Sequence, residues 1–159
     1  MKAKPEKEID PKYYSTWLYS AVHIATSIET LRSSEDIAKY FGVPSMSINP
    51  VLQSLENWGL IEYKNQSWIY KSGQNYHLDD MSPLSRMNHL NWRNHSLSRP
   101  LSPSESINYT SIFSISKKDL EVLRAQLLAY IKNQRDITAA SGSEEVVSFC
   151  CDFFKVSAN

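Results

Sequence analysis

The chain has 159 residues, of which 42% are hydrophobic and 21% are charged, and its 17 basic residues balance its 17 acidic ones. These values are typical of a globular protein with a hydrophobic core, and zero net charge excludes a global field that would draw the molecule onto nucleic acid. The apolar runs are too short for a membrane span and the charged start MKAKPEKEID lacks a signal sequence, so we expect no membrane partner.

The two cysteines, Cys150 and Cys151, are neighbours in the chain. Adjacent residues of a strand point to opposite faces, which disfavours a disulfide between them or a shared metal ion. We therefore expect a reduced, cytoplasmic protein that holds no metal and no other cofactor.

The first predicted element is a helix that follows a flexible N-terminus over residues 1–10. Asp10 and Pro11 form the pattern of an N-cap followed by a proline at the first helical position. The helix has one broad apolar face, made of Tyr14, Trp17, Leu18, Ala21, Val22, Ala25 and Ile28.

Two helices joined by a tight turn are predicted next. Ser33 and Asp36 form a capping box at the start of the first, and Gly42 supplies the left-handed residue that ends it. Pro50 belongs in the first turn of the second helix, which we expect to begin near Met46 or Ser47. The apolar face of this second helix comprises Ile48, Val51, Leu52, Leu55 and Trp58.

A β-hairpin completes the first half, because residues 60–63 and 67–70 alternate around a Lys64-Asn65-Gln66 turn. Three helices followed by a hairpin predict a winged helix-turn-helix domain over residues 11–72. The alternative is an unrelated helical hairpin beside a β-hairpin.

The second half predicts a small α-β-α-β subdomain over residues 82–156, so that the whole chain is of the α+β class. The predicted helix over residues 82–98 is polar, and residues 107–115 and 146–154 alternate as strands. Ser116 caps a helix between them, with the apolar stripe Leu120, Leu123, Leu127, Tyr130 and Ile131. Two strands are marginal alone, so we expect this subdomain to dimerise or to sense an effector. The expected dimer contacts are Phe149, Phe153 and Phe154.

Several motifs follow one another along the chain: Tyr13-Tyr14-x-x-Trp17, the runs at 37–43 and 52–61, Arg86-x-x-His89, and Phe149 with Phe153-Phe154. Their order resembles that of an uncharacterised bacterial family. In that family a winged-helix domain of unknown function follows an N-terminal Cro-repressor-like helix-turn-helix, and the proteins are regarded as transcriptional regulators. The resemblance implies regulation without catalytic residues. The N-terminal helix-turn-helix is absent here, so we expect either a part of a longer protein or a natural short member.

The predicted recognition helix lacks the chemistry that DNA readers normally use, since no Lys or Arg lies between Ser45 and Trp58. Residues 13–72 carry four basic and five acidic side chains. Because phosphate neutralisation supplies much of DNA affinity, we expect direct DNA contact to be weak and centred on the hairpin. The candidate contacts are Ser45, Ser47, Asn49, Gln53, Lys64, Asn65, Gln66 and Lys71.

A second candidate site is the positive segment around Arg86, His89 and Arg93, which share one face of the predicted helix over residues 82–98. This face could bind an anion or the acidic surface of a partner. The simpler interpretation is a solvated helix face neutralised by Asp79, Asp80 and Glu105.

Enzyme motifs are missing: the sequence has no G-x-S-x-G elbow, P-loop or H-E-x-x-H pair. We therefore expect a non-enzymatic transcription-regulatory module that acts through dimerisation or effector sensing. The alternative is a protein-interaction adaptor that keeps the winged-helix fold without binding DNA.

Overall fold

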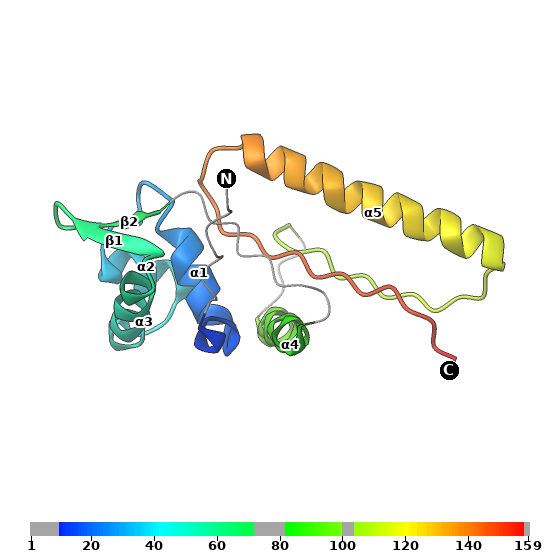
Figure 1. Ribbon diagram of the computed structural model, residues 1–159, viewed down its shortest axis with the longest axis horizontal. Coiled ribbons are helices and arrows are strands. Elements are labelled where there is room, and N and C mark those ends of the chain that lie inside the picture. The colour runs from blue at the N-terminus through cyan, green and yellow to red at the C-terminus, as the bar shows by residue number, and fades with distance from the viewer. Residues whose placement is uncertain (1–9, 72–81, 100–103, 158–159) are drawn as a thin grey trace, which may run out of the picture. The chain divides into compact units, whose positions relative to one another are not determined.

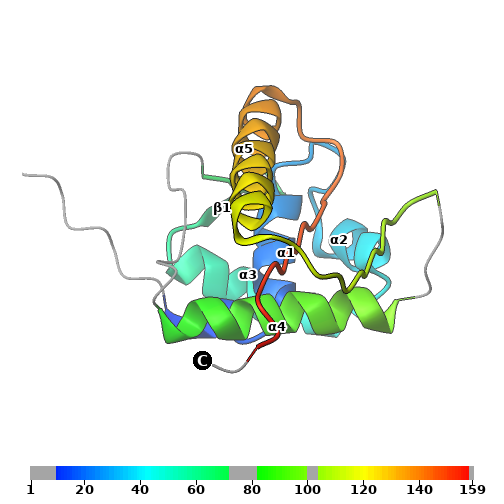
Figure 2. The same ribbon diagram turned by 90° about the vertical axis from the view of Figure 1, so that its right-hand side faces the viewer.

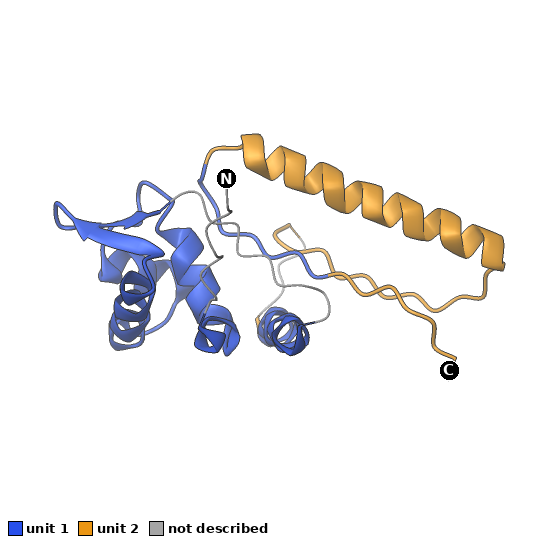
Figure 3. Cartoon of the chain, in the orientation of Figure 1, with its two compact units in different colours: residues 1–98, 143–150 blue, residues 99–142, 151–159 orange. Residues whose placement is uncertain are grey.

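The structure is a computed structural model that describes residues 10–71, 82–99 and 104–157. It confirms the α+β class: five α-helices and one 3₁₀ turn accompany a two-stranded antiparallel sheet among these residues. The chain divides into two compact units, shown in different colours in Figure 3. The first comprises residues 1–98 and 143–150, and the second comprises residues 99–142 and 151–159.

The expected first helix is divided into the 3₁₀ turn η1 (Pro11–Tyr14) and helix α1 (Trp17–Ala25). Asp10 caps η1 by accepting a hydrogen bond from the Lys12 N–H at 2.9 Å. Thr16 then adopts extended backbone and caps α1 by accepting from the Leu18 N–H at 3.3 Å. The second cap explains the division, because an extended residue cannot continue a helix.

Helix α2 (Ser34–Phe41) follows the predicted pattern. Both bonds of the capping box are present, between the Asp36 N–H and Ser33 Oγ at 3.1 Å and between the Ser33 N–H and Asp36 Oδ2 at 3.2 Å. The Ser33 hydroxyl also donates to Asp36 Oδ2 at 2.6 Å, and this bond, followed by the bond from the Ser33 N–H, stabilises the charged carboxylate and lowers the pKa of Asp36. Gly42 ends α2 with φ at +66°. Helix α3 (Ser45–Asn57) begins earlier than the expected Met46 or Ser47, so Pro50 lies inside the helix and not in its first turn as predicted.

Strands β1 (Ile61–Lys64) and β2 (Ser67–Tyr70) form the predicted hairpin, in which Ile61 pairs with Tyr70 and Lys64 with Ser67. The two turn residues, Asn65 and Gln66, both have positive φ, at 51° and 59°. A two-residue turn of this kind matches the right-handed twist of the strands. Figure 1 shows the hairpin beside α1, α2 and α3.

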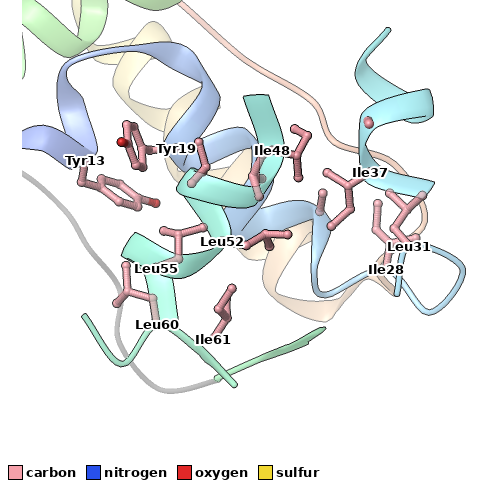
Figure 4. Packing of buried hydrophobic residues seen from close by; sticks show 14 of the residues in the cluster. Tyr13, Tyr19, Ile28, Leu31, Ile37, Ile48, Leu52, Leu55, Leu60 and Ile61 are labelled. Carbon is pink, nitrogen blue, oxygen red and sulfur yellow. The ribbon is translucent and has the colours of Figure 1, made fainter. Parts of the chain in front are cut away.

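The core of the first unit lies between these helices and the hairpin (Figure 4). Each helix contributes one apolar face, and β1 contributes Ile61. The largest hydrophobic side chains that are fully buried are Val22, Ile37, Ile48, Leu52, Leu55 and Ile61. The predicted phase of α3 is therefore confirmed, since its Ile48, Leu52 and Leu55 all point inward.

Helix α4 (Pro83–Ser98), which Figure 2 shows from the side, belongs to the first unit. None of its residues is fully buried, but Leu84 and Met87 pack against the core cluster. The Asn91 side-chain amide donates to the Tyr14 carbonyl at 2.8 Å, and the His95 ring stacks on Trp17 with centroids 3.7 Å apart. Polar and aromatic contacts thus attach α4 to η1 and α1.

The second half of the chain differs from the prediction. Its helix α5 (Lys117–Ala140) begins at the expected Ser116 cap, whose hydroxyl accepts from the Asp119 N–H at 3.0 Å. The predicted strands over residues 107–115 and 146–154 are wrong, because neither segment forms a sheet ladder with any described residue. Alternating side chains reveal a preference for extended backbone, but a strand also requires a neighbour whose backbone is in register.

Candidate nucleic-acid interface

The outer face of α3 carries short polar side chains. Ser47, Asn49 and Gln53 are exposed, whereas Ser45 at the first position of the helix is half-buried. Because the opposite, apolar face of α3 is buried, these polar side chains point away from the core. Asn and Gln can read the edge of adenine, and Ser can bind a phosphate oxygen.

The β1–β2 hairpin adds a second group of polar side chains. The candidate contacts on and after it, Lys64, Asn65, Gln66 and Lys71, are all exposed. The hairpin is joined to the last turn of α3, because Glu56 Oε1 accepts a hydrogen bond from the Tyr63 N–H at 3.3 Å. The two candidate groups therefore lie on elements that contact each other within the same unit.

Sequence reasoning missed Tyr63, an exposed aromatic residue of β1. Its ring lies 4.7 Å from that of Trp68 on the neighbouring strand, with which it is paired in register. Alternation along β1 places Tyr63 on the same face as the buried Ile61, opposite Glu62 and Lys64, so the sequence pattern held no signal of its exposure. An exposed aromatic ring beside a lysine can stack on a sugar or a base.

A buried histidine of α1, His23, packs against the hairpin. His23 on α1 is 2% exposed, and its Nδ1 lies 3.0 Å from the Tyr13 hydroxyl. Its ring also stacks on Tyr70 of β2, with centroids 4.8 Å apart. Burial lowers the pKa of His23 to about 4, and a hydrogen bond with the Leu60 backbone opposes part of this effect. His23 therefore stays neutral near pH 7 and acts as a structural contact between η1, α1 and β2.

The second candidate face is less uniform than the sequence pattern indicates. Arg86 is exposed, whereas His89 and Arg93 are half-buried. The helical spacing of these residues is as predicted, but two of the three side chains are partly covered.

The candidate dimer contacts lie on both sides of the boundary between the units, because Phe149 belongs to the first and Phe153 and Phe154 to the second. Phe149 and Phe154 are exposed and Phe153 is half-buried.

None of the helices in the described ranges is long and apolar enough to cross a membrane. Among the same residues, no group of three or more His, Cys, Asp or Glu side chains could hold a metal ion.

Comparison with known proteins identifies a family. No curated protein and no solved structure matches the chain. A family model described as a domain of unknown function, DUF4423, matches residues 2–156, which is nearly the whole sequence. The chain therefore belongs to the DUF4423 family.

Proposed function

We propose that residues 11–72 form a winged helix-turn-helix and that the protein is a transcription-regulatory module with weak direct DNA contact. The observation that carries this proposal is the joint placement of α3 and the hairpin. The polar outer face of α3 would enter the major groove, and Lys64, Asn65 and Gln66 would meet the flanking phosphates.

Weak binding follows from charge. α3 contributes no Lys or Arg, so the phosphate contacts rest on the few cations around the hairpin. Each lost phosphate contact lowers both affinity and its dependence on salt. A second DNA-binding element or a second copy of the chain would therefore strengthen binding.

Replacing Lys64 and Lys71 together with alanine should weaken DNA binding equally for all sequences. We expect the slope of log affinity against log salt to become shallower by about 2, because two phosphate contacts are lost. Fluorescence anisotropy of a labelled duplex, measured across a salt series, provides both quantities.

Lys132→Ala is the matched control, because Lys132 is an exposed lysine of α5 in the second unit. It should leave the salt slope unchanged. A loss confined to one base position in the Lys64 and Lys71 variant would contradict a wing-centred contact and would point to α3 as the dominant reader.

We also propose that the second unit makes the protein a homodimer. α5 has no fully buried residue, and large apolar side chains such as Ile112, at 88% exposed, and Phe154, at 75%, are open to solvent. Exposed apolar residues and extended segments without a ladder are both typical of association surfaces. Twofold pairs are the commonest closed assembly.

Light scattering at neutral pH should therefore give the mass of a dimer. Ile112→Asp combined with Phe154→Asp should give a monomer, because both changes place a charge at the proposed contact while removing little buried surface from a single chain. Phe149→Asp with Phe153→Asp should also dissociate the dimer or make the protein insoluble. A monomer mass for the unmodified protein at micromolar concentrations would contradict the dimer.

The alternative function is a protein-interaction adaptor that has kept the fold and lost DNA binding. The lack of Lys and Arg in α3 favours it, as do the exposed apolar side chains of the second unit. Affinity capture from a lysate distinguishes the two: stable protein partners recovered without nucleic acid would support the adaptor.

A further inference from the structure

Residues 107–115 lie in the second unit and run as an elongated trace that leads to α5 (Figure 1). Every residue of this segment is exposed, including large apolar ones such as Ile107, at 96%, and Tyr109, at 84%. None of its backbone N–H or C=O groups is hydrogen-bonded to another residue that the structure describes. Unpaired backbone that carries exposed apolar side chains is a template on which a further strand can pair.

The sequence of the segment, I-N-Y-T-S-I-F-S-I, is nearly symmetric about Ser111. If two copies pair antiparallel with Ser111 at the centre, residues of like character lie opposite each other. Aromatic pairs and β-branched pairs of this kind stabilise an antiparallel ladder. The opposed pairs are Ile107 with Ile115, Asn108 with Ser114, Tyr109 with Phe113, and Thr110 with Ile112.

This symmetry selects a second copy of the chain as the partner. A twofold axis through Ser111 makes the two strands antiparallel and gives both copies identical contacts, as a closed dimer requires. The segment contains no charged residue, so two copies meet without repulsion between like charges. An unrelated protein would have no reason to match the order of residues on both sides of Ser111.

Helix α5 of the same unit offers a cover for one face of such a ribbon, which would be marginal alone. Alternation places Phe113 and Ile115 on one face of the strand and Ile112 on the other. Phe113 and Ile115 are 54% and 39% exposed, whereas Ile112 is 88% exposed, so the first face is already partly covered. The half-buried apolar stripe of α5 comprises Leu120, Leu123, Leu127 and Ile131.

We propose that residues 107–115 of two copies pair as an antiparallel ribbon centred on Ser111. The interface of the homodimer is then an intermolecular sheet, in which the backbone groups of each segment that face the partner are paired. This inference rests on the proposed dimer and names its central contact. It is independent of DNA binding.

A disulfide across the twofold axis tests the register. In a chain with Cys150→Ser and Cys151→Ser, Ser111→Cys should form a covalent dimer on mild oxidation. Opposed Cα atoms of antiparallel strands lie about 4.5–5.5 Å apart, which a disulfide accepts. Ser114→Cys in the same background is the matched control, at an exposed serine of the same segment.

The control should stay monomeric on a denaturing gel, because its two copies would lie about 20 Å apart along the ladder. Mixing the Ser114→Cys chain with an Asn108→Cys chain should restore the crosslink, since these positions are opposed. If light scattering gives a dimer but Ser111→Cys crosslinks no faster than Ser114→Cys, the pairing is overturned and the proposed dimer stands. A monomer mass for the unmodified protein would overturn both.

Charged pairs test the same contact without oxidation. Tyr109→Lys with Phe113→Glu places opposite charges across both symmetric pairs, so light scattering should still give a dimer. Tyr109→Lys with Phe113→Lys places like charges there and should give a monomer. Both variants lose the same two rings, and physiological salt screens the charges that lie far apart. The same mass for the two variants would overturn the contact between Tyr109 and Phe113.

Discussion

Replacing Leu55 with alanine should lower the free energy of unfolding by about 2–5 kcal/mol. Leu55 lies on the inner face of α3 and its side chain is 0% exposed. The change removes buried apolar surface and leaves a cavity, which the surrounding helices fill only in part because protein cores are closely packed. Urea unfolding followed by circular dichroism measures the loss.

Gln53→Ala is the matched control, since Gln53 is an exposed residue of the same helix and loses a side chain of comparable length. It should change the free energy of unfolding by less than about 0.5 kcal/mol. A small effect of Leu55→Ala, comparable to that of the control, would show that the inner face of α3 is misassigned and would remove the basis for the proposed interface.

Acidification should destabilise the protein through His23. The pKa of His23 is about 4 in the folded state, against an ordinary value of 6.5 when the chain unfolds. Between these values the unfolded state binds the proton and the folded state does not, so stability falls as the pH falls. The stabilisation that comes from keeping His23 neutral in the folded state is fully present above pH 6.5 and is lost progressively as the pH falls to about 4. The total loss is on the order of 3 kcal/mol.

Urea unfolding at a series of pH values from 7 to 4 tests this prediction. His23→Gln should be less stable at pH 7 but should lose much less stability on acidification, because the titrating group is gone. His89→Gln is the control, at a half-buried position of α4, and should keep the full pH dependence. An unchanged pH dependence in His23→Gln would contradict the assignment.

Local chemistry made much of the first unit predictable. The Ser33 and Asp36 capping box, the left-handed Gly42 and the apolar spacing of α3 each act within a few residues, and the structure has all three. The hairpin was also predictable, because its turn and its alternating strands are adjacent in the sequence. Because the apolar face of α3 is buried, the polar residues on its opposite face are directed outward.

Long-range contacts could not be predicted in this way. The hydrogen bond between the Asn91 amide and the Tyr14 carbonyl joins residues far apart in the sequence, and neither segment has a pattern that predicts it. The alternation of residues 107–115 and 146–154 predicted strands, but pairing depends on which other segment lies beside each of them. A period of two residues carries no information about that neighbour.

The most direct test of the account is a site-resolved titration of the full chain with a short DNA duplex at low salt. We expect saturable NMR shifts at Ser47, Asn49 and Gln53 of α3 and at Lys64 to Gln66 of the hairpin, with α5 unaffected, and all shifts should shrink as salt is added. A spectrum that does not change at low salt, or that changes only in the second unit, would contradict the claim that α3 and the hairpin form a nucleic-acid interface.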